Sequence, residues 1–176
     1  VETATVDNRS LQMEKHCRAL VFRNVERLAE LERMLKLAGL ERFSANDFED
    51  AQNNELAQLL LKGVRQDELD VLDFIKEHTN EELGERLHEL TDIIRIDEKT
   101  EERLIADLYL TVTNLRLVRI KQILNQLRYL QDDPESEKDD KALLNMILSN
   151  TVLRGKLDHA LARPPVKRQT ITLWYS

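Results

Sequence analysis

Residues 100–130 read TEERLIADLYLTVTNLRLVRIKQILNQLRYL and contain no glycine or proline. Apolar side chains recur there at helical spacing, first at Ile105, Leu108, Val112 and Leu115, and after a shift at Ile120, Ile123, Leu127 and Leu130. The pattern predicts one helix, and a rise of about 1.5 Å per residue gives it a length of roughly 45 Å. Short helices cannot cover that length at every point, so part of this helix must pack on something else.

Shorter helical patterns precede this stretch and one follows it. We expect helices over residues 11–24, 25–38, 44–62, 66–78 and 79–91, and a last helix that ends near residue 162. The expected signals at the helix ends are Ser10 as an N-cap, Gly39 as a terminator, and capping boxes at Ser44 with Asp47 and at Thr79 with Glu82.

An acidic segment, QDDPESEKDD (131–140), separates the last two helices. Asp133 is predicted to cap the closing helix, with Pro134 at its first position, where a missing amide costs nothing. Two helices joined by so short a turn form an antiparallel hairpin. After that helix, Pro164 and Pro165 forbid further helix, and VKRQTITLWYS (166–176) is predicted to be an extended tail.

The predicted fold class is all-α, a helical bundle followed by a long helix and an antiparallel hairpin. The chain has 4 Gly and 3 Pro, too few for the turns of a sandwich or barrel, which recur every ~8–12 residues. The apolar spacing lapses near residues 95–99. We therefore expect a bundle subdomain over 10–96, a subdomain of the long helix and hairpin over 97–163, and the tail over 164–176.

Composition and charge limit the classes of function. Apolar residues make up 41% and charged residues 34% of the chain, so a core with a densely charged surface is expected. The net charge of −7 disfavours nonspecific binding to nucleic acid or to anionic membranes. With no membrane-span pattern and a single cysteine, Cys17, the sequence favours a soluble, cytoplasmic protein. Because it begins at Val1, we expect a piece of a longer protein.

No pattern in the sequence predicts catalysis, a cofactor or a metal site. Glu85 and His88 stand at i and i+3, the spacing used in di-iron helical bundles, but such a site needs that motif twice together with two more glutamates. Phosphate loops, nucleophile elbows and paired cysteines are absent from the sequence. We expect the chain to be non-catalytic, without cofactor or metal.

The long helix has a locally basic stretch at Arg116, Arg119, Lys121 and Arg128. Phosphate contact is one interpretation of it. Aromatic residues, at 5% of the chain, are not interleaved with these bases as stacking on nucleotides requires. A solvated or acid-paired face is the favoured interpretation, with weak or no direct binding to nucleic acid.

Taken together, two segments resemble the C-terminal domain of bacterial DNA primase. They are LERFSANDFEDAQNNELAQLLLKGVRQD (40–67), with the Asp47-Phe48 pair followed by a helix and Asp67, and LIADLYLTVTNLRLVRIKQILNQLRYL (104–130), with the Leu115–Leu117 element that leads into a helical hairpin. The resemblance covers about residues 11–162. It implies a domain without polymerase chemistry that docks on the replicative helicase hexamer. The N-terminal domain of that helicase looks similar in its bundle part and stays an alternative.

We expect the contact patch near the hairpin turn, where more apolar side chains gather than two helices can bury. Its predicted members are Leu124, Leu127, Tyr129, Leu130, Leu143, Met146 and Ile147. The alternative is that these side chains close against each other, or against a second copy of the chain in a homodimer.

Overall fold

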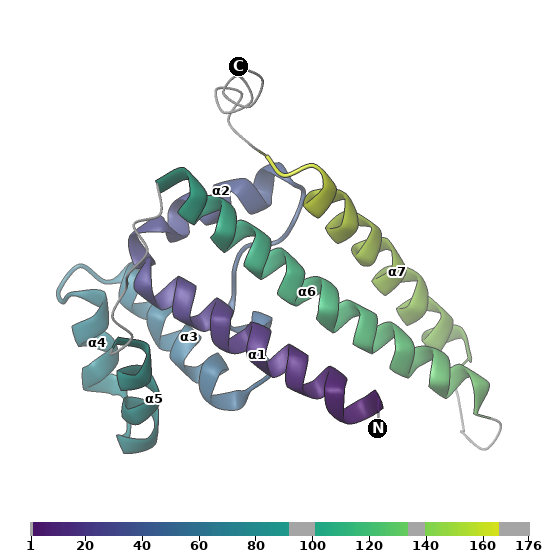
Figure 1. Cartoon of the computed structure of the whole chain (residues 1–176), viewed down its shortest axis with the longest axis horizontal. Helices are drawn as coiled ribbons and strands as arrows, with labels where there is room; N and C mark the ends of the chain where they lie inside the picture. The colour runs from purple at the N-terminus through teal and green to yellow at the C-terminus, as the bar shows by residue number, and fades with distance from the viewer. Residues whose placement is uncertain (1, 92–100, 134–139, 166–176) are drawn as a thin grey trace.

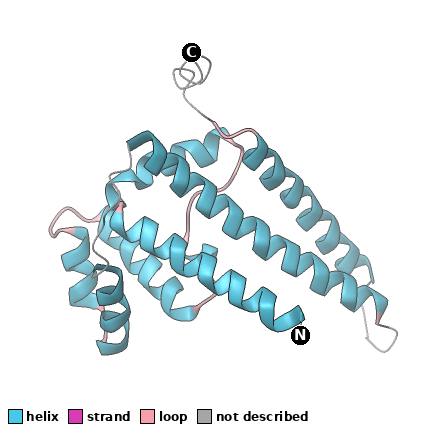
Figure 2. Ribbon diagram, in the orientation of Figure 1, coloured by secondary structure: helices cyan, strands magenta, loops and turns pink. Residues whose placement is uncertain are grey.

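The computed structural model describes residues 2–91, 101–133 and 140–165, and every regular element in them is helical (Figure 2). The predicted all-α fold class is confirmed. The elements are α1 (Glu2–Arg23), η1 (Val25–Arg27), α2 (Leu28–Leu37), η2 (Ala45–Asp47), α3 (Ala51–Arg65), α4 (Val71–His78), α5 (Glu81–Thr91), α6 (Glu101–Asp132) and α7 (Asp140–Ala162).

Helix α6 is the central element of the molecule. It runs between α1 on one side and α7 on the other (Figure 1), and it also contacts α2. Its buried side chains therefore lie on two faces rather than on one stripe, which explains the shift in the apolar pattern after Leu115. A helix that is apolar on more than one side needs burial on more than one side.

Helix α7 lies antiparallel to α6 along much of its length (Figure 1). The hydroxyl of Tyr109, in the first part of α6, donates a 3.0 Å hydrogen bond to the carbonyl oxygen of Ala160 near the end of α7. Tyr109 has no exposed surface, and Leu157 of α7 is equally buried. The hydroxyl that enters the core is therefore satisfied, as a buried polar group must be.

The remaining helices form the bundle. Helix α1 packs on α6 and α5, and α3 packs on α4. In the loop before α3, the rings of Phe43 and Phe48 meet edge to face with centroids 5.9 Å apart. The buried apolar side chains of the bundle and of α6 and α7 form one continuous core, which includes Leu31, Leu35, Leu56, Leu60, Ile75, Leu108, Leu124 and Leu157.

Several predicted helix ends are confirmed and others are wrong. Gly39 ends the α2 segment with a φ of 71°, and Ser44 with Asp47 forms the predicted capping box, although it opens the 3-10 turn η2. Ser10 caps nothing, because α1 already begins at Glu2. The cap of α5 is Asn80 rather than Thr79: its side-chain oxygen accepts a 2.8 Å hydrogen bond from the amide of Leu83.

Helix α3 passes through Gly63, where the sequence predicted its end, and continues to Arg65. A Cβ at position 63 would lie 3.1 Å from both Val71 Cγ1 and Phe74 Cδ1, so the glycine allows α4 to pack closely on α3. Helix α4 then begins only at Val71, after a cap by Asp70. The predicted subdomain boundary at 96/97, the helix start at Pro134 and the tail 166–176 lie outside the described residues.

Candidate protein-interaction surface

Helix α7 presents one face to α6. Leu157 and Ala160 are buried there, and Leu143, Ile147 and Leu161 are half-buried. Leu143 and Ile147 are four residues apart, as are Leu157 and Leu161, and at 3.6 residues per turn the ten residues between the two pairs keep all four on one side of the helix. This face accounts for only part of the apolar side chains of α7.

A second row of apolar side chains on α7 is exposed. Leu144, Leu148 and Val152, spaced four residues apart, are 49%, 55% and 61% exposed. We call these three residues the outer stripe. Met146 and Leu153 are also exposed, on another side of the helix. Since α7 is apolar on the face away from α6 as well as on the face against it, it has the pattern of a helix that is covered on more than one side.

The seven residues predicted to form the contact patch divide into three groups. Tyr129, Leu130 and Met146 are exposed at the ends of α6 and α7 that the 134–139 segment joins, and we call them the tip residues. Leu143 and Ile147 are half-buried.

The other two predicted patch residues, Leu124 and Leu127, do not have the exposed position expected of them. They are only 1% and 6% exposed. The physical reason is that the double-sided burial of α6 continues to this point of the helix. The outer stripe, by contrast, was missed as a surface. The signal for it was present in the sequence, because Leu144, Leu148 and Val152 form a second i, i+4 row beside Leu143 and Ile147.

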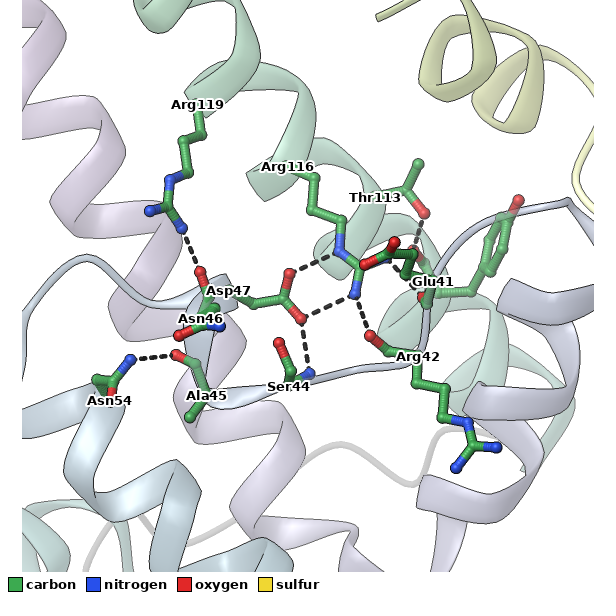
Figure 3. A network of polar contacts seen from close by, with 11 residues as sticks. Glu41, Arg42, Ser44, Ala45, Asn46, Asp47, Asn54, Thr113, Arg116 and Arg119 are labelled. Atoms are coloured by element: carbon green, nitrogen blue, oxygen red, sulfur yellow. Dashed lines mark hydrogen bonds and ion pairs between the residues drawn. The ribbon is translucent and has the colours of Figure 1, made fainter. Parts of the chain in front are cut away.

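An ion pair between α6 and the loop before α3 fixes the long helix against the bundle (Figure 3). Arg116 Nε lies 2.6 Å from Asp47 Oδ1, and an Nη of Arg116 lies 2.8 Å from Asp47 Oδ2. The same guanidinium donates to the carbonyl oxygens of Glu41 and Arg42 at 2.8 and 2.7 Å. Asp47 also accepts a 3.0 Å bond from the amide of Ser44. The bidentate geometry suits arginine and not lysine.

The basic stretch of α6 is acid-paired where it meets the bundle. Next to the Arg116 contact, Arg119 donates to the carbonyl oxygen of Asn46 (Figure 3). Arg119 also pairs with Glu49 at 3.1 Å. Lys121 and Arg128 are exposed. The first two bases therefore hold the loop, as the acid-paired interpretation of this stretch expected.

A second polar network joins α1, α3 and α5. Asn53 Oδ1 accepts hydrogen bonds from Arg18 at 2.6 Å and from Arg86 at 3.1 Å. Arg86 also pairs with Asp50, whose amide donates to Glu14 at 3.0 Å. Burial, assisted by the charge of Asp50, raises the pKa of Glu14. Burial acts upward on Asp50 too, but the amide of Asn53 and the charge of Arg86 lower its pKa overall.

The structure places the single thiol and the Glu85–His88 pair of the sequence. Burial raises the pKa of the Cys17 thiol well above its ordinary value, so it is protonated at neutral pH and is a poor nucleophile. Glu85 and His88 are exposed, and the part of the chain that is described contains no cluster of three potential metal ligands. In the depression between α1, η1, α2, α3 and the start of α4, Asp70 and Gln66 already bond backbone groups.

No family model, curated protein or solved structure matches this chain. Within the described ranges, no helix is both long enough and apolar enough to span a membrane.

Proposed function

We propose that this chain is a non-catalytic docking module of a bacterial DNA primase, and that the α6–α7 hairpin binds the replicative helicase and so couples primer synthesis to unwinding in the cytoplasm. The observation that carries the proposal is the group of exposed tip residues Tyr129, Leu130 and Met146, which are 79%, 46% and 51% exposed. Exposed large apolar side chains, aromatic ones above all, are enriched at protein–protein contact sites.

The position of the hairpin supports the same proposal. The Arg116–Asp47 pair holds the middle of helix α6, and α1 packs along one side of it. The C-terminal end of α6, which carries Tyr129 and Leu130, therefore belongs to a helix that is fixed against the bundle. A contact surface on a rigid element loses little conformational freedom when it binds. The class of partner, a replicative helicase, is taken from the resemblance to the primase domain around Asp47-Phe48 and Leu115–Leu117.

The test is binding of the chain to the cognate hexameric helicase. Titration calorimetry measures the affinity, and gel filtration detects the complex. Aspartate at Met146 or Tyr129 should weaken binding roughly tenfold or more, because a charge would replace an apolar anchor. Leu143 and Ile147 are unsuitable for this test because they are half-buried, so aspartate there could also destabilise the fold. Leu37→Asp is the matched control, since Leu37 is 67% exposed on α2 in the bundle.

Two results would reject the proposal. The first is a helicase that does not bind the wild-type chain. The second is a Met146→Asp, Tyr129→Asp double variant that is folded by circular dichroism and binds as tightly as Leu37→Asp. Light scattering of the chain alone tests the alternative of a self-associating module, which requires a dimer or larger species.

A further inference from the structure

Helix α5 stands at the edge of the molecule, on the side away from α7 (Figure 1). Its main neighbours among the described helices are α1 and α3. Of the α5 side chains that are described, Leu83 and Leu87 are buried. A two-residue connection, Thr79-Asn80, joins α5 to the end of α4. A peripheral helix with a short apolar face is the kind of element that opens locally while the rest of a fold stays closed.

An arginine fastens α5 to α3. Arg86 of α5 pairs with Asp50 and donates a 3.1 Å hydrogen bond to Asn53 Oδ1, both at the start of α3. The two side chains of the ion pair are each 28% exposed, so solvent screens their attraction only in part. Arg86 is therefore a polar anchor of α5 on the bundle.

A second arginine, Arg18 of α1, opposes this docking. It is buried between α3 and α5, donates to the same Asn53 oxygen at 2.6 Å and lies 3.9 Å from Glu89 of α5. Its Nε is buried, and no acceptor for it lies within the described residues. Burial and the positive charge of Arg86 lower the pKa of Arg18. The docked helix therefore keeps a guanidinium where its charge is disfavoured.

Three acidic side chains around the two arginines, Glu14, Asp50 and Glu89, only partly offset this cost. Asp50 pairs with Arg86, and Glu14 accepts the amide of Asp50 at 3.0 Å. Glu89 is 67% exposed, and exposed pairs contribute little. The docking of α5 is therefore a balance between the two buried leucines with their anchor and the buried charge of Arg18.

We propose that α5 opens as a unit about Thr79-Asn80, with Arg86 as the anchor that holds it closed, while α1, α3 and α6 stay folded. A helix of 11 residues is marginal in water on its own, so its amides exchange with solvent whenever it leaves the bundle. Opening exposes Leu83, Leu87 and the two oxygens that Arg86 occupies. The inference goes beyond the proposed function, because it concerns the bundle and does not depend on what the hairpin binds.

The test is native-state hydrogen exchange of the whole chain, measured by mass spectrometry on peptides from α5 and α3. After correction for intrinsic rates, α5 should exchange roughly tenfold faster than α3 or more, and low urea should accelerate α3 more strongly, because global unfolding exposes more surface. Leu157→Ala separates the two routes. It should accelerate exchange in α3 and α7 but not in α5, because opening of α5 leaves the buried contacts of Leu157 in α7 intact.

Two arginine variants test the anchor itself. Arg86→Met keeps much of the apolar length and removes the charge, so it should accelerate exchange in α5 roughly tenfold or more. Arg18→Met should instead slow that exchange severalfold, because it removes the buried cation beside Arg86. Arg33→Met, at an exposed arginine of α2, is the matched control and should leave exchange in α5 as in the wild type.

Equal exchange of α5 and α3 in the wild type would overturn the inference. So would an acceleration of α5 by Leu157→Ala as large as that of α3, because α5 would then leave only when the whole molecule unfolds. A third contrary result is an Arg86→Met variant, folded by circular dichroism, whose α5 exchanges as in the wild type. The last is an Arg18→Met variant that accelerates α5 as Arg86→Met does, because Arg18 would then hold the helix rather than oppose it.

Discussion

At the residue scale, the pair of Arg116 and Asp47 is a polar contact with a large expected effect on stability. The two side chains are only 15% and 8% exposed. A charge at such a site loses much of its hydration, and its partner replaces that hydration with two short hydrogen bonds. The pair joins the middle of α6 to the loop before α3, so its loss affects both elements.

We expect Arg116→Ala to lower the free energy of unfolding by about 3 kcal/mol, because it leaves the Asp47 carboxylate buried without its partner. Asp47→Asn should cost less, about 1–2 kcal/mol, since the amide oxygen still accepts from Arg116. Urea denaturation followed by far-UV circular dichroism measures both. The loss caused by Arg116→Ala should shrink in an Asp47→Ala background, as a double-mutant cycle requires for residues that interact.

The control for this pair is Arg33→Ala. Arg33 forms a surface pair with Glu30 at 3.2 Å, three residues away on α2, and such exposed pairs contribute within about 0.5 kcal/mol. If Arg116→Ala and Arg33→Ala change the unfolding free energy equally, Arg116 does not hold the loop as described.

The sequence predicted the local position of Asp47 in this contact, but it did not predict Arg116 as the partner. The spacing of Ser44 and Asp47 is local information, and the capping box it predicted is present. Arg116 lies 69 residues further along the chain. No rule of spacing connects residues so far apart, so the sequence identified Arg116 only as a member of a basic stretch. The same limit applies to Asn53, which brings Arg18 and Arg86 together across three helices.

At the element scale, long periodic helices were predicted best. Helix α6 agrees with the apolar pattern, which repeats over many residues. Helix α7 ends at Ala162, just before the proline pair, as expected because proline cannot continue a helix. Errors arose where one neighbouring residue competed with another for the same role, as Asn80 did with Thr79. The burial of Leu124 and Leu127 was missed for a different reason, since periodicity does not say how many neighbours a helix has.

The glycines of α3 and α7 permit a test of helix packing. Gly155→Ala should raise the unfolding free energy by about 1 kcal/mol, because alanine favours the helix and its Cβ meets nothing within 4 Å. Gly63→Ala should give no such gain, because its Cβ would lie 3.1 Å from Val71 and Phe74 side-chain atoms. Both values come from urea denaturation under the same conditions.

Gly84 provides the matched control within the bundle. Its nearest neighbour to an added Cβ is Thr79 Oγ1 at 4.0 Å, so Gly84→Ala should stabilise the protein as Gly155→Ala does. An equal gain at all three glycines would mean that α4 does not press against α3 at Gly63.

At the scale of the whole molecule, the bundle and the hairpin share α6. The sequence predicted two subdomains from the lapse in apolar spacing near residues 95–99, and this boundary lies outside the described residues. In the structure, buried side chains from α1 through α7 belong to one cluster, with α6 between the bundle and α7. Shared burial of this kind couples the two parts energetically.

We therefore expect the chain to unfold in one cooperative transition. Hydrogen exchange measured by mass spectrometry across a urea series should give the same midpoint for peptides from α3 and from α7. Leu157→Ala truncates a side chain with no exposed surface in α7 and should cost about 2–5 kcal/mol. In a coupled molecule that substitution lowers the midpoint of α3 as much as that of α7. Loss of protection in α7 alone, at urea concentrations where α3 stays protected, would contradict the shared core and would establish the hairpin as an independent folding unit.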